Sequence, residues 1–390
     1  MTHSHAGGGS SPPRLLFTVG DDGFFVSHRM PIARAARDAG IAVAVACPVT
    51  TRGDAIRAEG IRVLPLPLKR GRVSPLADLR TLAALVRLYR AERPDIVHAV
   101  ALKPVLYGAM AARLARVPAV VGALTGLGYV FSSSDIKARL LRPLVRAGLR
   151  WALGGRRSTC IVQNPDDRAF VAGLGVDRSR IVVIPGSGVD TARFAPSPEP
   201  EEPLRIAMVS RLLWDKGVGE FVEAARVARA QRPSLRFTLI GAPDEGNPSA
   251  VPLTHLEAWR DEGLIDWQGR RDDIPAVWKE SHVAVLPSYY AEGLPKALLE
   301  AASSGRPIVA ADVPGSREIA RDGESALLVP PRDPAALAAA ILRLAEDPAL
   351  RARLGAGGRR LVEREFSEER IAAETLALWR RLLDPAASGE

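Results

Sequence analysis

Short apolar runs of four to six residues alternate with longer amphipathic stretches along almost the whole chain. The short runs are bounded by glycine, proline and polar residues, as buried strands are, and the longer stretches repeat apolar residues at helical spacing. This alternation is typical of parallel sheets covered by helices on both faces. Four prolines and three glutamates interrupt it at Ala195–Pro203, and the same alternation then begins again. The pattern predicts an α/β fold of two doubly wound, Rossmann-like domains.

The expected strands of the first half are Leu15–Val19, Ala42–Ala46, Arg62–Leu66, Ile96–His98, Ala119–Leu124, Thr159–Val162 and Ile181–Ile184. Its expected helices are Ser27–Asp38, Leu76–Ala91, Pro104–Ala115, Ile136–Leu153 and Asp166–Ala172. The expected strands of the second half are Leu204–Val209, Arg236–Ile240, Ile265–Gln268, Val283–Leu286, Ile308–Ala311 and Ala326–Val329. Its expected helices are Val218–Gln231, Leu253–Glu262, Pro295–Ser304, Pro334–Ala345, Pro348–Arg364 and Ser367–Leu383. We expect a disordered leader at 1–13, domains at 14–195 and 204–365 joined by a semi-rigid, solvated linker at 196–203, and a terminal helix at 366–390 anchored by Trp379.

The net charge of +9 is divided unevenly between the two halves of the chain. Residues 1–195 hold 28 basic and 13 acidic residues, a balance of +15, and the remainder holds 25 and 31, a balance of −6. This asymmetry favours an anionic partner for the first domain, although an arginine-rich composition is an alternative explanation. No apolar run reaches the roughly 18 residues of a membrane-spanning helix. The two cysteines, Cys47 and Cys160, end apolar runs and are expected to be buried free thiols.

The stretch from Val283 to Gly305 carries the strongest chemical pattern. A predicted strand is followed by a polar loop and by Pro295, which we expect at the first position of a helix. The amides from Lys296 onward are then free donors at the positive end of a helix dipole, where an anion such as a phosphate can bind. Glu292 and Glu300 lie on either side of these amides and can accept hydrogen bonds from ligand hydroxyl groups. The pattern therefore favours a nucleotide-sugar site, with a hydrolytic carboxylate pair as the alternative.

Two basic residues follow the first strand of the second half. Arg211 and Lys216 lie in a loop where both can reach one diphosphate, and they would neutralise the charge of a departing nucleoside diphosphate. The glycine-containing loop Pro185–Asp190 can complete the phosphate cradle. The loop Gly269–Ile274 resembles one whose backbone reads the edge of a base.

The first half offers three weaker groups. The loop after the first strand, Gly20–Arg29, is not a G-x-G-x-x-G fingerprint, which disfavours nicotinamide cofactors. We expect Ser27 to be a helix N-cap, and its side chain can point into a cleft together with those of His28 and Arg29. Alternatively, His28 and Arg29 are ordinary surface residues of the first helical turn. His98, expected at a strand's carboxyl end, is either a ligand contact or a structural histidine. Thr125 and Gly126 open a Thr-Gly-Leu-Gly loop that can also be an ordinary turn.

These motifs together resemble the retaining glycosyltransferases of family 4, which have the GT-B fold. The resemblance rests on Arg211 with Lys216, on Pro185–Asp190, and on Glu292-Gly293-Leu294-Pro295 with Glu300. It implies a nucleotide-sugar donor in the second domain and an acceptor in the first. It assigns the donor ribose to Glu300, the transferred sugar to Glu292, the diphosphate to Arg211 and Lys216, and donor contacts to Ile274, Gly293, Leu294 and Pro295. It also places His98 near the transferred sugar and the terminal helix back on the first domain.

The subtype follows from Phe24–Pro31, from the loop that begins at Thr125, and from Tyr290–Lys296. They look like members that act on polyprenyl-diphosphate-linked sugars, with UDP-linked N-acetylhexosamines or related donors. Ser27, His28, Arg29, Thr125 and Gly126 would then contact the acceptor.

The region Ile136–Arg157 agrees with a membrane-linked acceptor. It holds seven basic residues and no acidic one, interleaved with leucines, so a helix there could lie on an anionic membrane surface. The alternative is a surface helix whose leucines belong to the core. We therefore expect a cytoplasmic enzyme held at the inner face of the cell membrane.

For the reaction, we expect the β-phosphate of the donor to take the proton of the incoming hydroxyl group, while the protein supplies positioning and electrostatics. No Asp-x-Asp motif is apparent, so no metal ion is expected. We also expect no nucleic-acid partner. Alternatives are a UDP-sugar epimerase of the same fold, a family 4 transferase with a soluble acceptor, and an inactive binding subunit.

Overall fold

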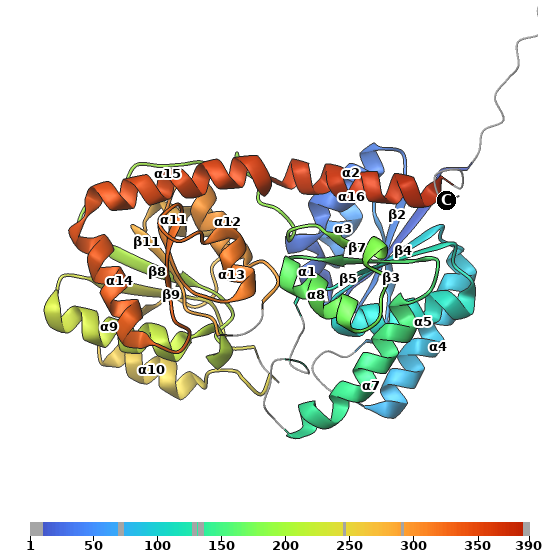
Figure 1. The fold of residues 1–390 in the computed structure, drawn as a ribbon, viewed down its shortest axis with the longest axis horizontal. Helices are drawn as coiled ribbons and strands as arrows, with labels where there is room; N and C mark the ends of the chain where they lie inside the picture. The colour runs from blue at the N-terminus through green and yellow to red at the C-terminus, as the bar shows by residue number, and fades with distance from the viewer. Residues whose placement is uncertain are drawn as a thin grey trace, which may run out of the picture. The chain divides into compact units, whose positions relative to one another are not determined.

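The computed structural model describes residues 11–68, 74–126, 131, 136–244, 247–289 and 292–384. The chain forms two compact units, one of residues 1–123, 147–160 and 372–390 and the other of residues 124–146 and 161–371. Figure 1 shows their strands and helices.

Two sheets organise the chain, and every register resolved between neighbouring strands is parallel. The first sheet has seven strands in the order β3-β2-β1-β4-β5-β6-β7, and the second has six in the order β10-β9-β8-β11-β12-β13. The strands of the first sheet are β1 (Arg14–Thr18), β2 (Ala42–Cys47), β3 (Arg62–Pro65), β4 (Ile96–Val100), β5 (Ala119–Ala123), β6 (Ser158–Val162) and β7 (Ile181–Val183). Those of the second are β8 (Arg205–Val209), β9 (Arg236–Ile240), β10 (Asp266–Trp267), β11 (Val283–Leu286), β12 (Ile308–Ala311) and β13 (Ala326–Val329). The predicted α/β class with two parallel sheets is confirmed, because every predicted strand is present.

Helices connect the strands in both sheets. Those of the first half are α1 (Asp22–His28), α2 (Met30–Asp38), α3 (Gly53–Ala58), α4 (Pro75–Glu92), α5 (Leu102–Ala115), α7 (Ile136–Leu153) and α8 (Pro165–Gly173). Those of the second half are α9 (Val218–Gln231), α10 (Leu253–Asp261), α11 (Ile274–Lys279), α12 (Lys296–Ser303), α13 (Pro314–Ile319), α14 (Pro334–Glu346), α15 (Pro348–Glu365) and α16 (Glu368–Leu383). Short 3-10 helices lie at η1 (Arg178–Arg180) and η2 (Trp214–Lys216). Within the units, α4 packs on α5 and α9 packs on α14 (Figure 1).

Three helices begin with the same local device, an Asp or Asn followed by proline. Asn164 accepts a hydrogen bond from the Asp167 amide at 2.7 Å, and Asp333 and Asp347 accept from the third residue after each of them. The side chain satisfies an amide that has no intrahelical partner, and the proline has no amide to satisfy. These caps fix where α8, α14 and α15 start.

Two sequence predictions about the first sheet are wrong. Ser27 is not an N-cap, because Asp21 caps α1 by accepting from the Phe24 amide at 2.6 Å, and the helix predicted from Ser27 is two helices that meet at Arg29. His98 is not at the end of its strand, because β4 continues to Val100. His98 is instead paired in register with Phe17 in the middle of the sheet.

The C-terminal helix α16 supplies residues 372 onward to the first unit. Trp379 is fully buried there, and its ring lies 5.7 Å from Phe17 and 5.5 Å from His98 in edge-on geometry. The prediction that Trp379 anchors this helix is confirmed.

The proline-rich segment 196–203 is fastened to the second unit by two buried arginines. Arg306, 1% exposed, donates to Ser197 and to the Pro198 carbonyl, and Arg351, 5% exposed, binds both carboxylate oxygens of Glu199 at 2.8 and 2.9 Å. The segment is largely solvated, as its composition predicts, but it is held in place at two points.

Candidate functional site

The candidate site begins at Glu292–Pro295, the last part of the connection from β11 to α12. Pro295 is the N-cap of α12 and not its first helical residue, so the prediction is displaced by one position. The amides of Leu298 and Leu299 donate to the Pro295 carbonyl at 3.2 and 3.3 Å. Free donors at this helix start are therefore fewer than the sequence predicts.

Residues far away in the sequence hold this loop. The Gln163 side chain, at the end of β6, accepts from the Leu294 amide at 2.8 Å, and Gly126 forms an antiparallel bridge with Glu292. A Cβ atom at Gly293 would lie 1.8 Å from Gln163 Oε1, and one at Gly315 would lie 1.9 Å from the Gly293 carbonyl oxygen. Backbone atoms exclude a side chain at Gly315, and a side chain at Gly293 would displace Gln163 from the loop, so both glycines keep this backbone path.

Gln163 and its neighbour Asn164 are not among the residues predicted from the sequence. The Asn164 side-chain amide lies 3.5 Å from the Gly293 carbonyl oxygen. Asn164 was visible as an Asn-Pro helix cap at a strand's end. Gln163 carries no such signal, because its role depends on a contact with a residue 131 positions away.

Lys216 and Glu292 form an ion pair in which the side chains are only 14% and 9% exposed. Lys216 ends η2, and the following Gly217 has a φ of 80° and no room for a Cβ atom, which would lie 2.3 Å from the Pro287 carbonyl oxygen. The Asp215 carbonyl accepts from Ser288 Oγ and the Tyr289 amide, so the loop after β8 is bound to the loop after β11. The second carboxylate oxygen of Glu292 is buried and has no hydrogen-bond partner among the described residues. The fold thus brings together two of the predicted donor-site residues and leaves a buried acceptor beside a cation.

Arg211 is paired with a different carboxylate. Its guanidinium contacts Asp244 at 2.7 Å, and Asn247 donates to the same carboxylate at 3.3 Å. Asp244 follows β9 in a loop that joins the Arg211 loop through a hydrogen bond from the Trp214 amide to the Ser249 carbonyl. Asp244 is not among the residues predicted from the sequence, although an acidic residue shortly after a strand that neighbours the expected phosphate-binding arginine is a detectable signal.

Glu300 lies in the middle of α12 and is partly buried. Burial raises the pKa of Glu300 to about 7, against the opposing charges of Lys296 and Arg193, while Glu368 adds to the rise. The Lys296 ammonium group lies 3.9 Å from Glu368. Glu300 is therefore a carboxyl group that changes its charge near neutral pH.

The other loops predicted for the donor have structural contacts. Gly186 and Gly188 both have a φ of 72°, and a Cβ atom at Gly186 would lie 3.0 Å from Leu294. Asp190 accepts from the Ala192 and Arg193 amides and closes a turn. Ile274 is the first residue of α11 and packs against the hydrophobic core of the second sheet.

The residues predicted for the acceptor divide into exposed and buried ones. Ser27 Oγ lies 2.7 Å from His28 Nδ1 and 2.9 Å from the Gly23 carbonyl oxygen, and His28 stacks on Phe24. Arg29 and His98 are 4% and 1% exposed. Thr125 and Gly126 follow β5, and the rest of that loop lies outside the described residues.

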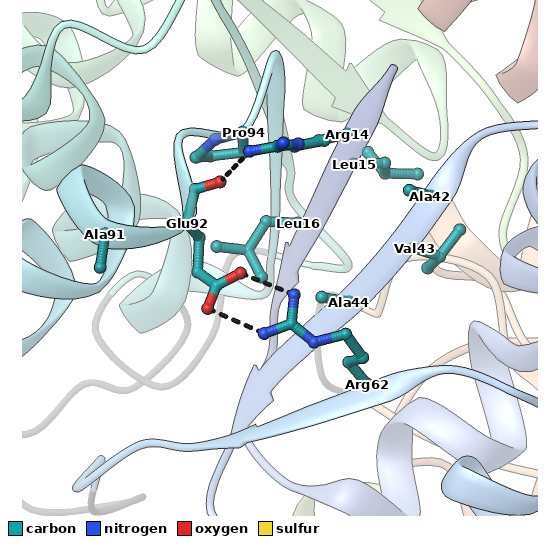
Figure 2. A pocket seen from close by; sticks show the side chains of 10 residues that line it. All are labelled: Arg14, Leu15, Leu16, Ala42, Val43, Ala44, Arg62, Ala91, Glu92 and Pro94. Atoms are coloured by element: carbon teal, nitrogen blue, oxygen red, sulfur yellow. Dashed lines mark hydrogen bonds and ion pairs between the residues drawn. The ribbon is translucent and has the colours of Figure 1, made fainter. Parts of the chain in front are cut away.

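A pocket of 410 Å³ lies at the opposite, amino-terminal ends of β1, β2 and β3 (Figure 2). Its charged residues satisfy one another, because Arg62 binds both oxygens of Glu92 at 2.9 and 3.0 Å and Arg14 donates to the Glu92 carbonyl. Ligands of open α/β sheets bind at the carboxyl ends of the strands. This pocket is therefore not the candidate site.

Across the described ranges, no three His, Cys, Asp or Glu side chains gather closely enough to hold a metal ion. No helix in the part of the chain that the structure describes is long and apolar enough to cross a membrane.

Comparison with known proteins agrees with this architecture. Residues 27–187 match the model of the glycosyl transferase 4-like domain, and residues 203–347 match that of the group 1 glycosyl transferases. The chain is 28% identical over 381 residues to N,N'-diacetylbacillosaminyl-diphospho-undecaprenol α-1,3-N-acetylgalactosaminyltransferase of Campylobacter jejuni, which covers 92% of this chain and 98% of the relative. It is also 30% identical to the Escherichia coli UDP-Gal:α-D-GlcNAc-diphosphoundecaprenol α-1,3-galactosyltransferase. That alignment of 311 residues covers 75% of this chain and 77% of the relative.

Among solved structures, Anabaena HepE in complex with UDP is 20% identical, with a TM-score of 0.74 over 94% of this chain and 99% of HepE. That likeness shows the fold. The chain belongs to the group 1 glycosyltransferases with a 4-like first domain, and it is a hexosyltransferase with two Rossmann-like domains.

Proposed function

We propose that this glycosyltransferase moves an N-acetylhexosamine or a related hexose from a UDP-sugar to a polyprenyl-diphosphate-linked saccharide, with retention of the anomeric configuration. The two relatives named above support the acceptor class, since both names specify a sugar linked to undecaprenol through a diphosphate. The E. coli relative's name also specifies a UDP-linked donor.

The observation that carries the proposal is the ion pair of Lys216 with Glu292. A lysine beside a carboxylate, both nearly buried where the loops after β8 and β11 meet, offers a positive charge to a diphosphate and hydrogen-bond acceptors to a sugar hydroxyl group. Glu300, further along α12, is the ribose contact in this proposal. Arg211 provides a second cation for the diphosphate after releasing Asp244. No step in this arrangement requires a metal ion, since Lys216 and Arg211 carry the positive charge that stabilises the leaving diphosphate.

The remaining predicted contacts keep their roles as parts of the proposal. Gly293, Leu294, Pro295 and Ile274 belong to the donor side, and Ser27, His28, Arg29, Thr125 and Gly126 belong to the acceptor side. The proton of the attacking hydroxyl group passes to the donor β-phosphate as the bond to the diphosphate breaks.

Peripheral membrane attachment is part of the same proposal, and α7 supplies its support. Leu140 and Leu144, one helical turn apart, are 72% and 71% exposed, and the neighbouring Arg139 and Arg146 are also exposed. Exposed leucines among arginines fit an anionic lipid surface, which would also present the lipid-linked acceptor.

The test is an in vitro transfer assay with a panel of UDP-sugars and a polyprenyl-diphosphate-linked saccharide. We expect UDP release that depends on the acceptor, a product heavier by one sugar residue, and retention of configuration by NMR. A Lys216→Met variant should lose transfer, whereas Lys279→Met, at an exposed lysine that ends α11, should keep it. Conversion of a UDP-sugar into another UDP-sugar without UDP release would instead identify an epimerase.

A further inference from the structure

Arg29 is a buried cation that has no counter-ion among the described residues. It lies between α1 and α2, is 4% exposed, and its Nε is buried with no hydrogen-bond partner among the described residues. Burial lowers the pKa of Arg29 to about 10, and no neighbouring carboxylate opposes that effect. Buried charges in proteins are normally paired, because an isolated charge is costly to remove from water.

Two further unpaired polar groups lie in the same aromatic core as the α1–α2 junction. The Arg29 amide donates to the Phe25 carbonyl, and the Phe25 ring lies 5.4 Å from Phe17, whose ring is 5.1 Å from His98 and 5.7 Å from Trp379. Both ring nitrogens of His98 and the indole Nε1 of Trp379 are buried and lack partners within the described chain. The His98 and Trp379 rings lie 5.5 Å apart, and the charge of Arg29 is close enough to His98 to lower the pKa of that histidine further below its usual range. We call Arg29, His98 and Trp379 the Arg29 cluster.

The chemistry of the Arg29 cluster selects its ligand. A guanidinium and an indole are donors only, and a neutral imidazole provides one more donor. The cluster therefore offers several donors and a positive charge, with no carboxylate among them.

We propose that the Arg29 cluster binds a phosphoryl oxyanion. Arginine matches phosphate oxygens with two parallel hydrogen bonds, and the Trp379 and His98 N–H groups supply further donors. The oxyanion has two possible sources, free inorganic phosphate or the diphosphate of the acceptor. The second source rests on the proposed function, whereas the site itself does not.

The site is tested by measuring the melting temperature against inorganic phosphate at constant ionic strength, in saturating UDP so that the donor site is filled. We expect phosphate to raise the melting temperature of the wild-type protein by about 2–4 °C. Arg29→Met should abolish this rise, since it removes an unpaired charge and leaves no counter-ion behind. Arg34→Met, at a half-exposed arginine of the same helix, should respond like the wild type. A missing response in the wild type, or an equal response in Arg29→Met, would overturn the proposal.

Kinetics then distinguish the source. A tenfold or larger rise in acceptor KM in Arg29→Met, with the UDP-sugar KM unchanged, identifies the acceptor's phosphate. Unchanged kinetics together with a lost phosphate response identifies free phosphate and overturns the proposed acceptor contact of Arg29. If Arg29→Met does not fold, the same titration is made with Arg29→Lys. We expect phosphate to raise the melting temperature of Arg29→Lys less than that of the wild type. An equal rise would count against the site. If no UDP-sugar supports transfer, the proposed function fails, and the phosphate titration still decides the Arg29 cluster.

Discussion

Breaking the Lys216–Glu292 pair from either side should destabilise the second unit. Lys216→Met leaves the Glu292 carboxylate, 9% exposed, with no cation and with one oxygen already lacking a partner. Removing one member of a fully buried pair typically costs 3–5 kcal/mol, so we expect about 2–4 kcal/mol for this nearly buried one. Glu292→Gln keeps a hydrogen-bonding oxygen next to Lys216, and its cost should be about 1–2 kcal/mol.

The double variant Lys216→Met with Glu292→Gln separates the pair from other effects. It leaves neither charge uncompensated, so its loss of stability should be smaller than the sum of the two single losses by at least about 1 kcal/mol. Urea unfolding followed by tryptophan fluorescence measures this, since Trp214, Trp259, Trp267 and Trp278 all belong to the second unit. Strictly additive losses, or a Lys216→Met variant as stable as the wild type, would refute the reasoning.

Three further predictions concern other elements. Because the raised pKa of Glu300 makes the folded state bind a proton more tightly than the unfolded chain does, stability should fall as pH rises from about 4.5 to about 7. In urea unfolding, the free energy of unfolding of Glu300→Gln should therefore equal that of the wild type near pH 4.5 and exceed it by about 1–3 kcal/mol at pH 8. The same variant should bind the UDP-sugar more weakly. Equal stability of the two proteins at pH 8 would contradict this. Gly217→Ala should cost more than about 1 kcal/mol, because its left-handed backbone and the Pro287 carbonyl both exclude a Cβ atom; calorimetry that shows no loss would argue against this packing. Leu140→Ser with Leu144→Ser should reduce flotation with phosphatidylglycerol vesicles and leave transfer to a water-soluble acceptor analogue intact; unchanged flotation would remove α7 from the membrane contact.

The strands and most helices follow from the sequence because a parallel sheet imposes a local pattern. Each buried strand is a continuous apolar run, and each helix shows one apolar face, so neighbouring residues suffice to find both. The errors arose where a local signal had a competitor. Ser27 is a good cap, but Asp21 caps first, so the helix begins earlier. His98 is polar enough to suggest a strand end, yet aromatic packing against Phe17 and Trp379 accommodates it in mid-strand.

The candidate site was only partly predictable for a related reason. Motifs within one loop, such as Glu292–Pro295, can be read from a single stretch. The partners that define their chemistry come from other strands, as Gln163 does for Leu294 and Asp244 does for Arg211. Their residue types carry no distinctive local signal, and only the order of the strands brings them close.

The fastening of the proline-rich segment has a practical consequence for dissecting the molecule. Arg306 and Arg351 are almost fully buried, and their partners Ser197, Pro198 and Glu199 all lie before the first strand of the second sheet. A fragment that starts at Leu204 would leave both guanidinium groups without these partners, at a cost of several kcal/mol. A fragment that starts at Ala195 keeps them. A cut that keeps both arginine contacts therefore lies ahead of the prolines, not after them.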